Sequence, residues 1–164
     1  MRSMLKVYWD SNSPIYAISQ SELQKKGIQC LFIDIDGTLV NRKSTKIANA
    51  VKKWIFESKK YFSLYLISNN PSKKRIEKIA NELKLRYKYN ASKPRKKVTL
   101  SAINEFGCEL KNIAIIGDRI FTDIIVGNRC NIKTILVKRL GRDGLPIKFN
   151  FTLFIEKLII FFIK

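Results

Sequence analysis

Short apolar runs alternate along this chain with segments in which apolar residues recur every three or four positions. The runs are rich in Ile, Leu and Val and end in polar or glycine residues, which is the pattern of buried strands. The segments between them have one apolar and one lysine-rich side, as amphipathic helices do. We therefore expect strands at residues 28–35, 62–67, 87–91, 113–116 and 132–137, and helices at residues 47–58, 71–83, 98–106 and 123–129.

The alternation of strands and helices predicts βαβ units with right-handed connections. We expect an α/β fold: one domain over residues 1–148, with a parallel sheet of about five strands flanked by helices. Within it, residues 1–27 are interpreted as a lead-in that packs on the first strand and holds a short helix at 19–26. The connections are too short for a second domain.

The tail, residues 149–164, is almost wholly apolar and is broken only by Asn150, Thr152, Glu156 and Lys157 before the last lysine. A transmembrane helix needs about 20 apolar residues, and this segment is shorter. Three interpretations stay open: a terminal helix packed on the sheet, a helix in the membrane interface, and, least favoured, a true span.

The charge balance narrows the range of partners. Lys and Arg total 32 against 13 acidic residues, for a formal net charge of +19. Such an excess attracts polyanions such as nucleic acid, an anionic bilayer or phosphorylated substrates. Compositional drift also explains it, since lysine is spread along the whole chain. Apolar residues make up 46%, enough for a full core, so a disordered chain is excluded.

The absence of histidine excludes Ser-His-Asp and Cys-His catalysis and any histidine-ligated metal. Cys30, Cys108 and Cys130 fit neither a zinc pattern nor a disulfide framework, so we interpret them as small core residues of a protein in a reducing compartment. No apolar stretch of the signal-peptide type precedes residue 28. We expect a cytoplasmic protein, with peripheral attachment to the inner face of a membrane as the alternative that the tail suggests.

Two carboxylates, Asp34 and Asp36, follow the first predicted strand. In open α/β sheets, ligands bind at the carboxyl ends of the strands. Side chains at positions i and i+2 of a strand point the same way, and two such carboxylates repel each other unless a cation or a proton lies between them. This pair therefore indicates a metal site or acid–base chemistry.

Polar residues also follow the other predicted strands. Ser68 and Asn69 follow the second, Lys93 the third, and Asp118 and Asp123 the fourth. In a parallel sheet these residues lie along one edge. Aspartates without His or Cys favour a hard cation such as Mg²⁺. Mg²⁺ with a lysine and a hydroxyl forms a cradle for phosphate, and a carboxylate can attack phosphorus to form an aspartyl-phosphate.

Four motifs, in a characteristic order, carry a resemblance to a known family. They are Asp-Ile-Asp-Gly-Thr at 34–38, the serine at 68, Lys93-Pro94, and Gly117-Asp118 with Asp123. Together they resemble the haloacid dehalogenase (HAD) superfamily, subclass IIIA. Ser-Asn-Asn at 68–70 and Gly-Asp-Arg-Ile-Phe-Thr-Asp-Ile at 117–124 resemble its YqeG-type branch, which includes phosphatidylglycerophosphate phosphatases. Gly37 departs from that branch, which usually has Asn there.

The resemblance implies roles for the first motif and the metal. Asp34 would be the nucleophile and a Mg²⁺ ligand. Asp36 would be the general acid and base, with its backbone carbonyl on the metal. Thr38 would support this motif and the phosphate site, and Asp118 would be a further metal ligand.

The resemblance also implies how phosphate is held. Ser68 and the Asn69 backbone amide would bind the phosphoryl group, and Lys93 would neutralise it and the nucleophile. Asp123 would hold Lys93 or a water on the metal. Simpler interpretations stay open: a turn at the first motif, a helix N-cap at 68–71, a solvated basic face around Lys93, and a helix cap at Asp123.

The substrate is inferred from missing segments. Residues 38–62 and 70–87 have room for one helix each and for no cap domain, so the site should be open. An open site suits a lipid head group, a nucleic-acid end or a protein. We expect a Mg²⁺-dependent phosphomonoester hydrolase that converts phosphatidylglycerophosphate to phosphatidylglycerol in phospholipid biosynthesis. The oligomeric state is not predicted.

Three alternatives remain. A nucleic-acid end phosphatase would need a basic groove, for which residues 86–97 are the candidate, with Tyr87 and Tyr89 able to stack on bases. Another phosphomonoesterase of the same fold would act on a different small substrate. A non-catalytic membrane or nucleic-acid binding protein on the same scaffold is the third.

Overall fold

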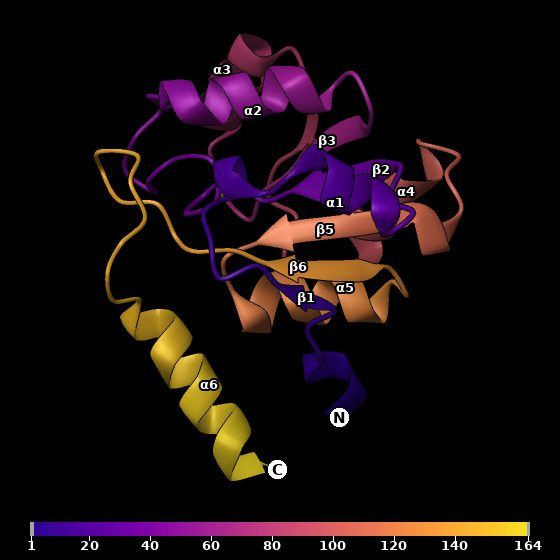
Figure 1. Ribbon diagram of the computed structural model, residues 1–164, viewed down its shortest axis with the longest axis vertical. Coiled ribbons are helices and arrows are strands. Elements are labelled where there is room, and N and C mark those ends of the chain that lie inside the picture. The colour runs from indigo at the N-terminus through magenta and orange to yellow at the C-terminus, as the bar shows by residue number, and fades with distance from the viewer. Residues whose placement is uncertain (1, 164) are drawn as a thin grey trace.

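The computed structural model of the chain describes residues 2–163 (Figure 1). Its centre is a six-stranded sheet in the order β1-β6-β5-β2-β3-β4, in which every neighbouring pair of strands is parallel. The α/β fold and the parallel sheet predicted from the pattern are thus confirmed, with six strands in place of about five. The strands are β1 Trp9–Asp10, β2 Cys30–Ile33, β3 Ser63–Ile67, β4 Arg86–Lys88, β5 Ile113–Gly117 and β6 Lys133–Leu136.

Helices cover both faces of this sheet. One core cluster joins α1, α2 and α3 to one face, and a second joins α4 and α5 to the other. The central strands β2 and β5 are buried on both faces, which explains their continuous apolar runs. The α-helices are α1 Gln20–Lys25, α2 Asn49–Ser58, α3 Lys73–Leu83, α4 Lys97–Asn104, α5 Ile125–Arg129 and α6 Phe151–Ile163; shorter turns are η1 Arg2–Leu5, η2 Ile15–Ala17, η3 Leu110–Asn112 and the π-helical turn η4 Ile120–Ile124.

The lead-in contributes more than packing. Trp9 pairs with Ile135, so β1 extends the sheet at the edge beyond β6. Residues 1–27 therefore also contribute an edge strand, which the sequence pattern did not predict. A strand of two residues is too short to show an alternating pattern, and only its neighbour β6 specifies it.

The start of α3 differs from the prediction by two residues. Its N-cap is Ser72, whose hydroxyl accepts a hydrogen bond from the Arg75 backbone N–H at 3.4 Å. Residues 68–71 therefore lie before the cap, and the interpretation of that segment as a helix N-cap was wrong. The helix predicted at 123–129 likewise begins as η4, with Asp123 inside the π-helical turn.

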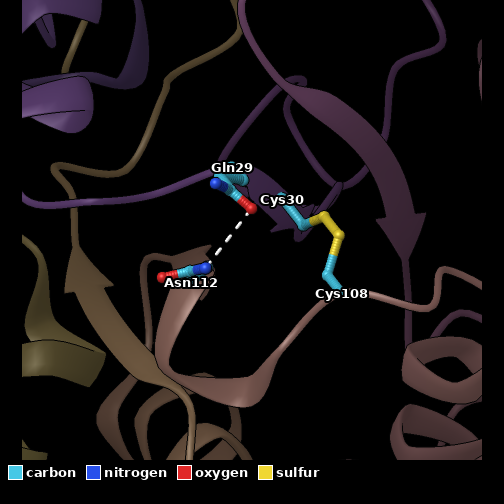
Figure 2. Close-up of a disulfide and its surroundings, with 4 residues drawn as sticks. All are labelled: Gln29, Cys30, Cys108 and Asn112. Carbon is cyan, nitrogen blue, oxygen red and sulfur yellow. Dashed lines mark hydrogen bonds between the residues drawn. A yellow bond between two sulfur atoms is a disulfide. The ribbon is translucent and has the colours of Figure 1, made fainter.

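Cys30 and Cys108 form a disulfide, contrary to the expectation that the cysteines do not pair (Figure 2). Cys30 begins β2, and Cys108 lies just before η3 and β5. Because β2 and β5 are neighbours, with Cys30 opposite Ile113, the fold brings together two cysteines 78 residues apart. Cys130 is free and buried, as expected of a core residue. The pairing removes the cysteine argument for a reducing compartment.

The tail forms the helix α6, which extends from the body at the end opposite to α2 and α3 (Figure 1). Leu153 and Ile160 pack on a small cluster formed by Ile120, Ile124 and Leu136. Across residues 2–163, none of the helices has the length and hydropathy that crossing a bilayer requires.

Candidate active site

The predicted site residues meet at the carboxyl edge of the sheet. Asp34 follows the end of β2 and Asp118 follows the end of β5, and hydrogen-bonded pairing of these two strands sets their carboxylates close together. A cavity of about 100 Å³ opens there. Its wall includes Asp34, Asp36, Arg42, Asn69, Asn70, Pro71, Lys93, Asp118, Arg119, Thr122 and Asp123.

Lys93 lies between two carboxylates at the centre of the site. Its Nζ is 2.6 Å from Asp34 Oδ1 and 2.6 Å from Asp123 Oδ1, and it also donates to the Ile67 carbonyl at 3.1 Å. Lys93 is 4% exposed, so its interpretation as part of a solvated basic face was wrong. Burial lowers the pKa of this ammonium, but the charges of Asp123 and Asp34 outweigh burial and raise the pKa above its usual range.

The loop that carries Lys93 is held by Asn69. The Lys93 backbone N–H donates to Asn69 Oδ1 at 2.7 Å, and Asn69 Nδ2 donates back to the Lys93 carbonyl at 2.8 Å. This reciprocal pair connects the end of β3 to the loop after β4. The Asn69 side chain therefore positions Lys93. The Asn69 backbone amide is the group that the family resemblance predicts to bind phosphate.

Asp34 is buried at the base of the cavity. Thr38 Oγ1 donates to Asp34 Oδ2 at 3.2 Å, while Lys93 holds Oδ1. Burial raises the pKa of Asp34 to about 8, and the charges of Asp123 and Asp118 act in the same direction, against the lowering effect of Lys93. Thr38 is fully buried and does not line the cavity, so its contact in this structure is to the carboxylate.

The Asp36 side chain turns away from the other aspartates, toward α3. Its Oδ1 is 2.7 Å from Arg75 Nη2, and its Oδ2 accepts from Asn70 Nδ2 at 3.2 Å and from Ser68 Oγ at 3.5 Å. Arg75 also donates to the Ser44 carbonyl at 2.8 Å. Asp36 is thus held at the wall of the cavity, and Ser68, which is fully buried, supports it from behind.

Asp118 has one oxygen that is paired and one that is not. Arg139 Nε is 2.5 Å from Asp118 Oδ2, while Oδ1 is buried without a hydrogen-bond partner. Burial, together with the charge of Asp123, raises the pKa of Asp118 to about 6 against the lowering effect of Arg139. One carboxylate oxygen from each of Asp34, Asp118 and Asp123 lies within 4.8 Å of the others.

This donor set fits a magnesium ion. Mg²⁺ takes oxygen ligands and keeps several waters, so it needs few protein carboxylates. The unpaired Asp118 oxygen and the neighbouring Asp34 carboxylate are suited to hold it. Asp123 completes the cluster in place of the Asp36 carboxylate, which faces Arg75. This leaves the Asp36 backbone carbonyl as the only group of that residue predicted to contact a metal.

Gly37 is required by this packing. Its φ is +99°, in the region that favours glycine, and a Cβ at this position would lie 2.7 Å from Asp118 Oδ2 and 3.0 Å from Arg139 Nε. The ion pair between Arg139 and Asp118 occupies the space that a side chain at position 37 would need. This explains why position 37 is glycine here, where the branch usually has asparagine.

Sequence reasoning missed Arg75 and Arg139. Arg139 lies just beyond β6, at the same sheet edge as the aspartates, so the argument from strand ends could have found it. Arg75 is one of several basic residues near the start of α3, and nothing in the chain distinguishes it from its neighbours Lys73 and Lys74. Asn70 was noted as part of a motif but was not expected to contact Asp36.

The raised pKa values predict how magnesium affects stability at different pH. Without metal, the folded protein binds protons on Asp34 and Asp118 that the unfolded chain releases above about pH 4. The stability from this binding is complete below that pH and is lost as pH rises through the folded pKa values of about 6 and about 8.

Magnesium binding needs these carboxylates in their ionised form. The increase in melting temperature caused by Mg²⁺ should therefore be small near pH 5 and large near pH 8. An equal increase at both pH values would contradict this.

Comparisons with known proteins agree with this geometry. Residues 90–143, which hold Lys93, Asp118 and Asp123, match the model of a HAD-hydrolase-like family. The chain is 27% identical over 137 residues to "Probable phosphatase YqeG" of Bacillus subtilis (strain 168), which covers 83% of this chain and 80% of that protein. The match to the family model covers the part of the chain with Lys93, Asp118 and Asp123, and the similarity to YqeG extends over most of the chain.

Solved structures share the fold at lower identity. An uncharacterized protein from Listeria monocytogenes serotype 4b aligns with a TM-score of 0.57 and 15% identity, over 77% of this chain and 86% of that one. The 3-deoxy-D-manno-octulosonate 8-phosphate phosphatase of Moraxella catarrhalis, solved with magnesium, phosphate and KDO, aligns with a TM-score of 0.50 and 16% identity, over 78% and 87%. These likenesses support the fold.

Proposed function

We propose that the chain is a Mg²⁺-dependent phosphomonoester hydrolase that forms an aspartyl-phosphate on Asp34. The observation that carries this proposal is the position of Lys93 Nζ, 2.6 Å from both Asp34 and Asp123, beside an Asp118 oxygen that has no partner. A nucleophilic carboxylate needs a nearby cation to ionise in a buried site, and the phosphoryl group needs positive charge around it. The match of residues 90–143 to the HAD-hydrolase-like model supports the same reaction.

The first half of the reaction uses Asp34 and Asp36. An Asp34 carboxylate oxygen forms a bond to phosphorus while the bond from phosphorus to the alcohol oxygen breaks. The leaving oxygen takes a proton from the Asp36 carboxyl group. Lys93 holds Asp34 in place and offsets negative charge on the phosphoryl group, and a magnesium ion held by Asp34 and Asp118 would neutralise the phosphoryl oxygens.

The second half returns the enzyme to its starting state. Asp36, now ionised, takes a proton from a water molecule whose oxygen attacks phosphorus. The bond between phosphorus and Asp34 breaks, and inorganic phosphate leaves. Arg75 and Asn70 hold the Asp36 carboxyl group at the cavity wall through both halves. Thr38 orients Asp34 by its hydrogen bond to Oδ2.

The proposed substrate is phosphatidylglycerophosphate, which would yield phosphatidylglycerol. Only α2 is inserted between β2 and β3, and only α3 between β3 and β4, so no cap covers the cavity from these connections. The net charge of +19 favours an anionic partner. A protein at the cytoplasmic face of an anionic membrane would meet this head group without having to enclose it, and the similarity to YqeG supports the same branch.

A comparison of substrates tests this proposal. Purified protein with Mg²⁺ should release phosphate from phosphatidylglycerophosphate in mixed micelles with a much higher kcat/KM than from a phosphorylated oligonucleotide or from p-nitrophenyl phosphate. Chelation of the metal should stop release from all three. If the lipid is ignored while an oligonucleotide end is hydrolysed efficiently, the lipid assignment fails and the nucleic-acid alternative takes its place.

The nucleic-acid alternative has one supporting observation. An open groove beside β4 is lined by Lys84, Arg86, Tyr87 and Lys88. The last three belong to the run 86–97, in which tyrosines were expected to stack on bases. Glu105 also lines this groove and pairs with Lys88 at 2.6 Å. Among the described residues, none lines both this groove and the catalytic cavity. A strand held there would need a further contact to reach Asp34.

A further inference from the structure

We propose that a groove beside α6 binds anionic lipid, so that α6 docks the protein on an anionic bilayer next to the catalytic cavity. The groove, called here the α6 groove, lies between α6 with its preceding segment and the residues that follow β6, and it has a volume of about 250 Å³. This inference rests on the proposed function for the identity of the lipid substrate. The contact between α6 and the bilayer does not depend on that function.

The polar part of the α6 groove is basic. Lys138 and Arg139 line it from the segment after β6, and Lys148 and Lys157 line it from the side of α6. The acidic residue among its lining is Asp10, which lies 3.5 Å from Lys157. Since Arg139 pairs with Asp118 and Lys157 lies near Asp10, the excess of positive charge comes from Lys138 and Lys148, and it matches phosphate head groups.

The apolar part of the α6 groove continues onto an exposed face of the helix. Phe149 and Phe154 line the groove and are 63% and 48% exposed. Phe151 and Leu158, three residues before and four after Phe154, share its side of the helix and are also exposed. Large apolar side chains next to lysines are the pattern of a helix that lies in a membrane interface.

The opposite side of α6 contacts the segment that follows β5 through Glu156. This side chain is 2% exposed, accepts a hydrogen bond from the Ile120 backbone N–H at 2.8 Å, and lies 3.4 Å from Arg119 Nε. Ile120 begins η4, the turn between Asp118 and α5 that contains Asp123. Glu156 therefore connects α6 directly to the turn that follows Asp118 and contains Asp123.

Arg139 places the α6 groove next to the catalytic cavity. Its side chain lines the groove and its Nε is 2.5 Å from Asp118 Oδ2. Arg119, the residue after Asp118, lines the cavity itself. A lipid surface seated on α6 would consequently lie beside the opening through which a phosphorylated head group reaches Asp34.

Charge and apolar content together select a bilayer over other occupants. A second copy of this chain would bring lysines against lysines and a net charge of +19 against the same charge, which opposes association. A nucleic acid would use the lysines but leave the phenylalanine side chains in water, unless bases stack on them. An anionic bilayer matches both parts of the groove at once.

Vesicle binding by the full chain tests the inference. Flotation is measured with vesicles of phosphatidylglycerol and phosphatidylcholine, and with pure phosphatidylcholine, for the wild type and for the double variant Phe154→Ser with Lys148→Glu. The matched control is Phe56→Ser with Lys53→Glu on α2, at the other end of the molecule, where Phe56 is 44% exposed. Melting temperatures and hydrolysis of p-nitrophenyl phosphate report folding and basal activity.

The wild type should float with the anionic vesicles and not with pure phosphatidylcholine. The double variant should weaken this binding at least about tenfold, and the control should change it less than about twofold. Basal hydrolysis should be equal in all three proteins. Docking without lipid hydrolysis would retain this inference and refute the proposed substrate.

The inference would be overturned by no flotation of the wild type, by equal loss in both variants, or by a concentration-dependent dimer that the double variant alone loses while vesicle binding is unchanged. Binding of an RNA oligomer that depends on Phe154 and Lys148 when vesicle binding does not would also overturn it.

Discussion

Replacing Asp34 with asparagine is expected to lower phosphate release at least about a thousandfold, because the amide cannot form the bond to phosphorus. The loss should appear in kcat for every substrate, including p-nitrophenyl phosphate, whose leaving group needs no proton. A steady-state assay with Mg²⁺ near neutral pH measures it. Residual activity within about tenfold of the wild type would show that Asp34 is not the nucleophile.

The same variant should remain folded. Burial raises the pKa of Asp34 to about 8, so ionising this carboxyl costs the metal-free fold free energy, and asparagine, which has the same shape and does not ionise, avoids that cost. Between about pH 5 and about pH 8, the wild type should lose more stability than the variant, because only the wild type gives up a proton on Asp34. Urea unfolding at the two pH values measures this difference.

Replacing Lys93 with methionine is expected to reduce both activity and stability. The substitution keeps a long side chain but leaves Asp34 and Asp123 buried without the ammonium that lies 2.6 Å from each of them. Removing one partner of a buried ion pair costs about 3–5 kcal/mol of unfolding free energy. Urea denaturation of the metal-free protein measures the cost, and the phosphatase assay should show no turnover.

A nearby lysine supplies the control for this variant. Lys88, on β4, pairs with Glu105 at 2.6 Å with its side chain 35% exposed, so Lys88→Met should cost less than about 1 kcal/mol. Adding Asp123→Asn to Lys93→Met should restore part of the stability, because one unpaired carboxylate is removed, but none of the activity. A Lys93→Met protein as stable as the wild type would refute the electrostatic role assigned to this residue.

The sheet and the meeting of the aspartates could be predicted because both depend on local patterns. Each central strand is an apolar run that ends in a polar residue, and parallel pairing brings those ends to one edge. This reasoning led to Asp34, Lys93, Asp118 and Asp123, which the structure places in contact or within one cluster. The family resemblance is confirmed by the HAD-like match and the similarity to YqeG.

Features that depend on contacts between distant segments could not be predicted. The disulfide joins residues 78 apart, and β1 is defined by its neighbour β6, more than 120 residues away. Arg75 reaches Asp36 from the first turn of α3, and Glu156 reaches Ile120 from the tail helix. In each case the local sequence does not identify the distant partner, and only the packed fold shows what the side chain touches.

We propose that Asp34 carries the phosphoryl group and that Asp36 assists its release. The Asp36→Asn variant, reacted with p-nitrophenyl phosphate, tests it most directly, because this leaving group departs without a proton while the later attack by water still needs the base. We expect a burst of one p-nitrophenolate per enzyme, with the phosphoryl group retained. Borohydride reduction and peptide mass mapping should locate it at residue 34. A label on another residue, or an unlabelled protein that turns over steadily, would show that Asp34 is not the phosphoryl carrier.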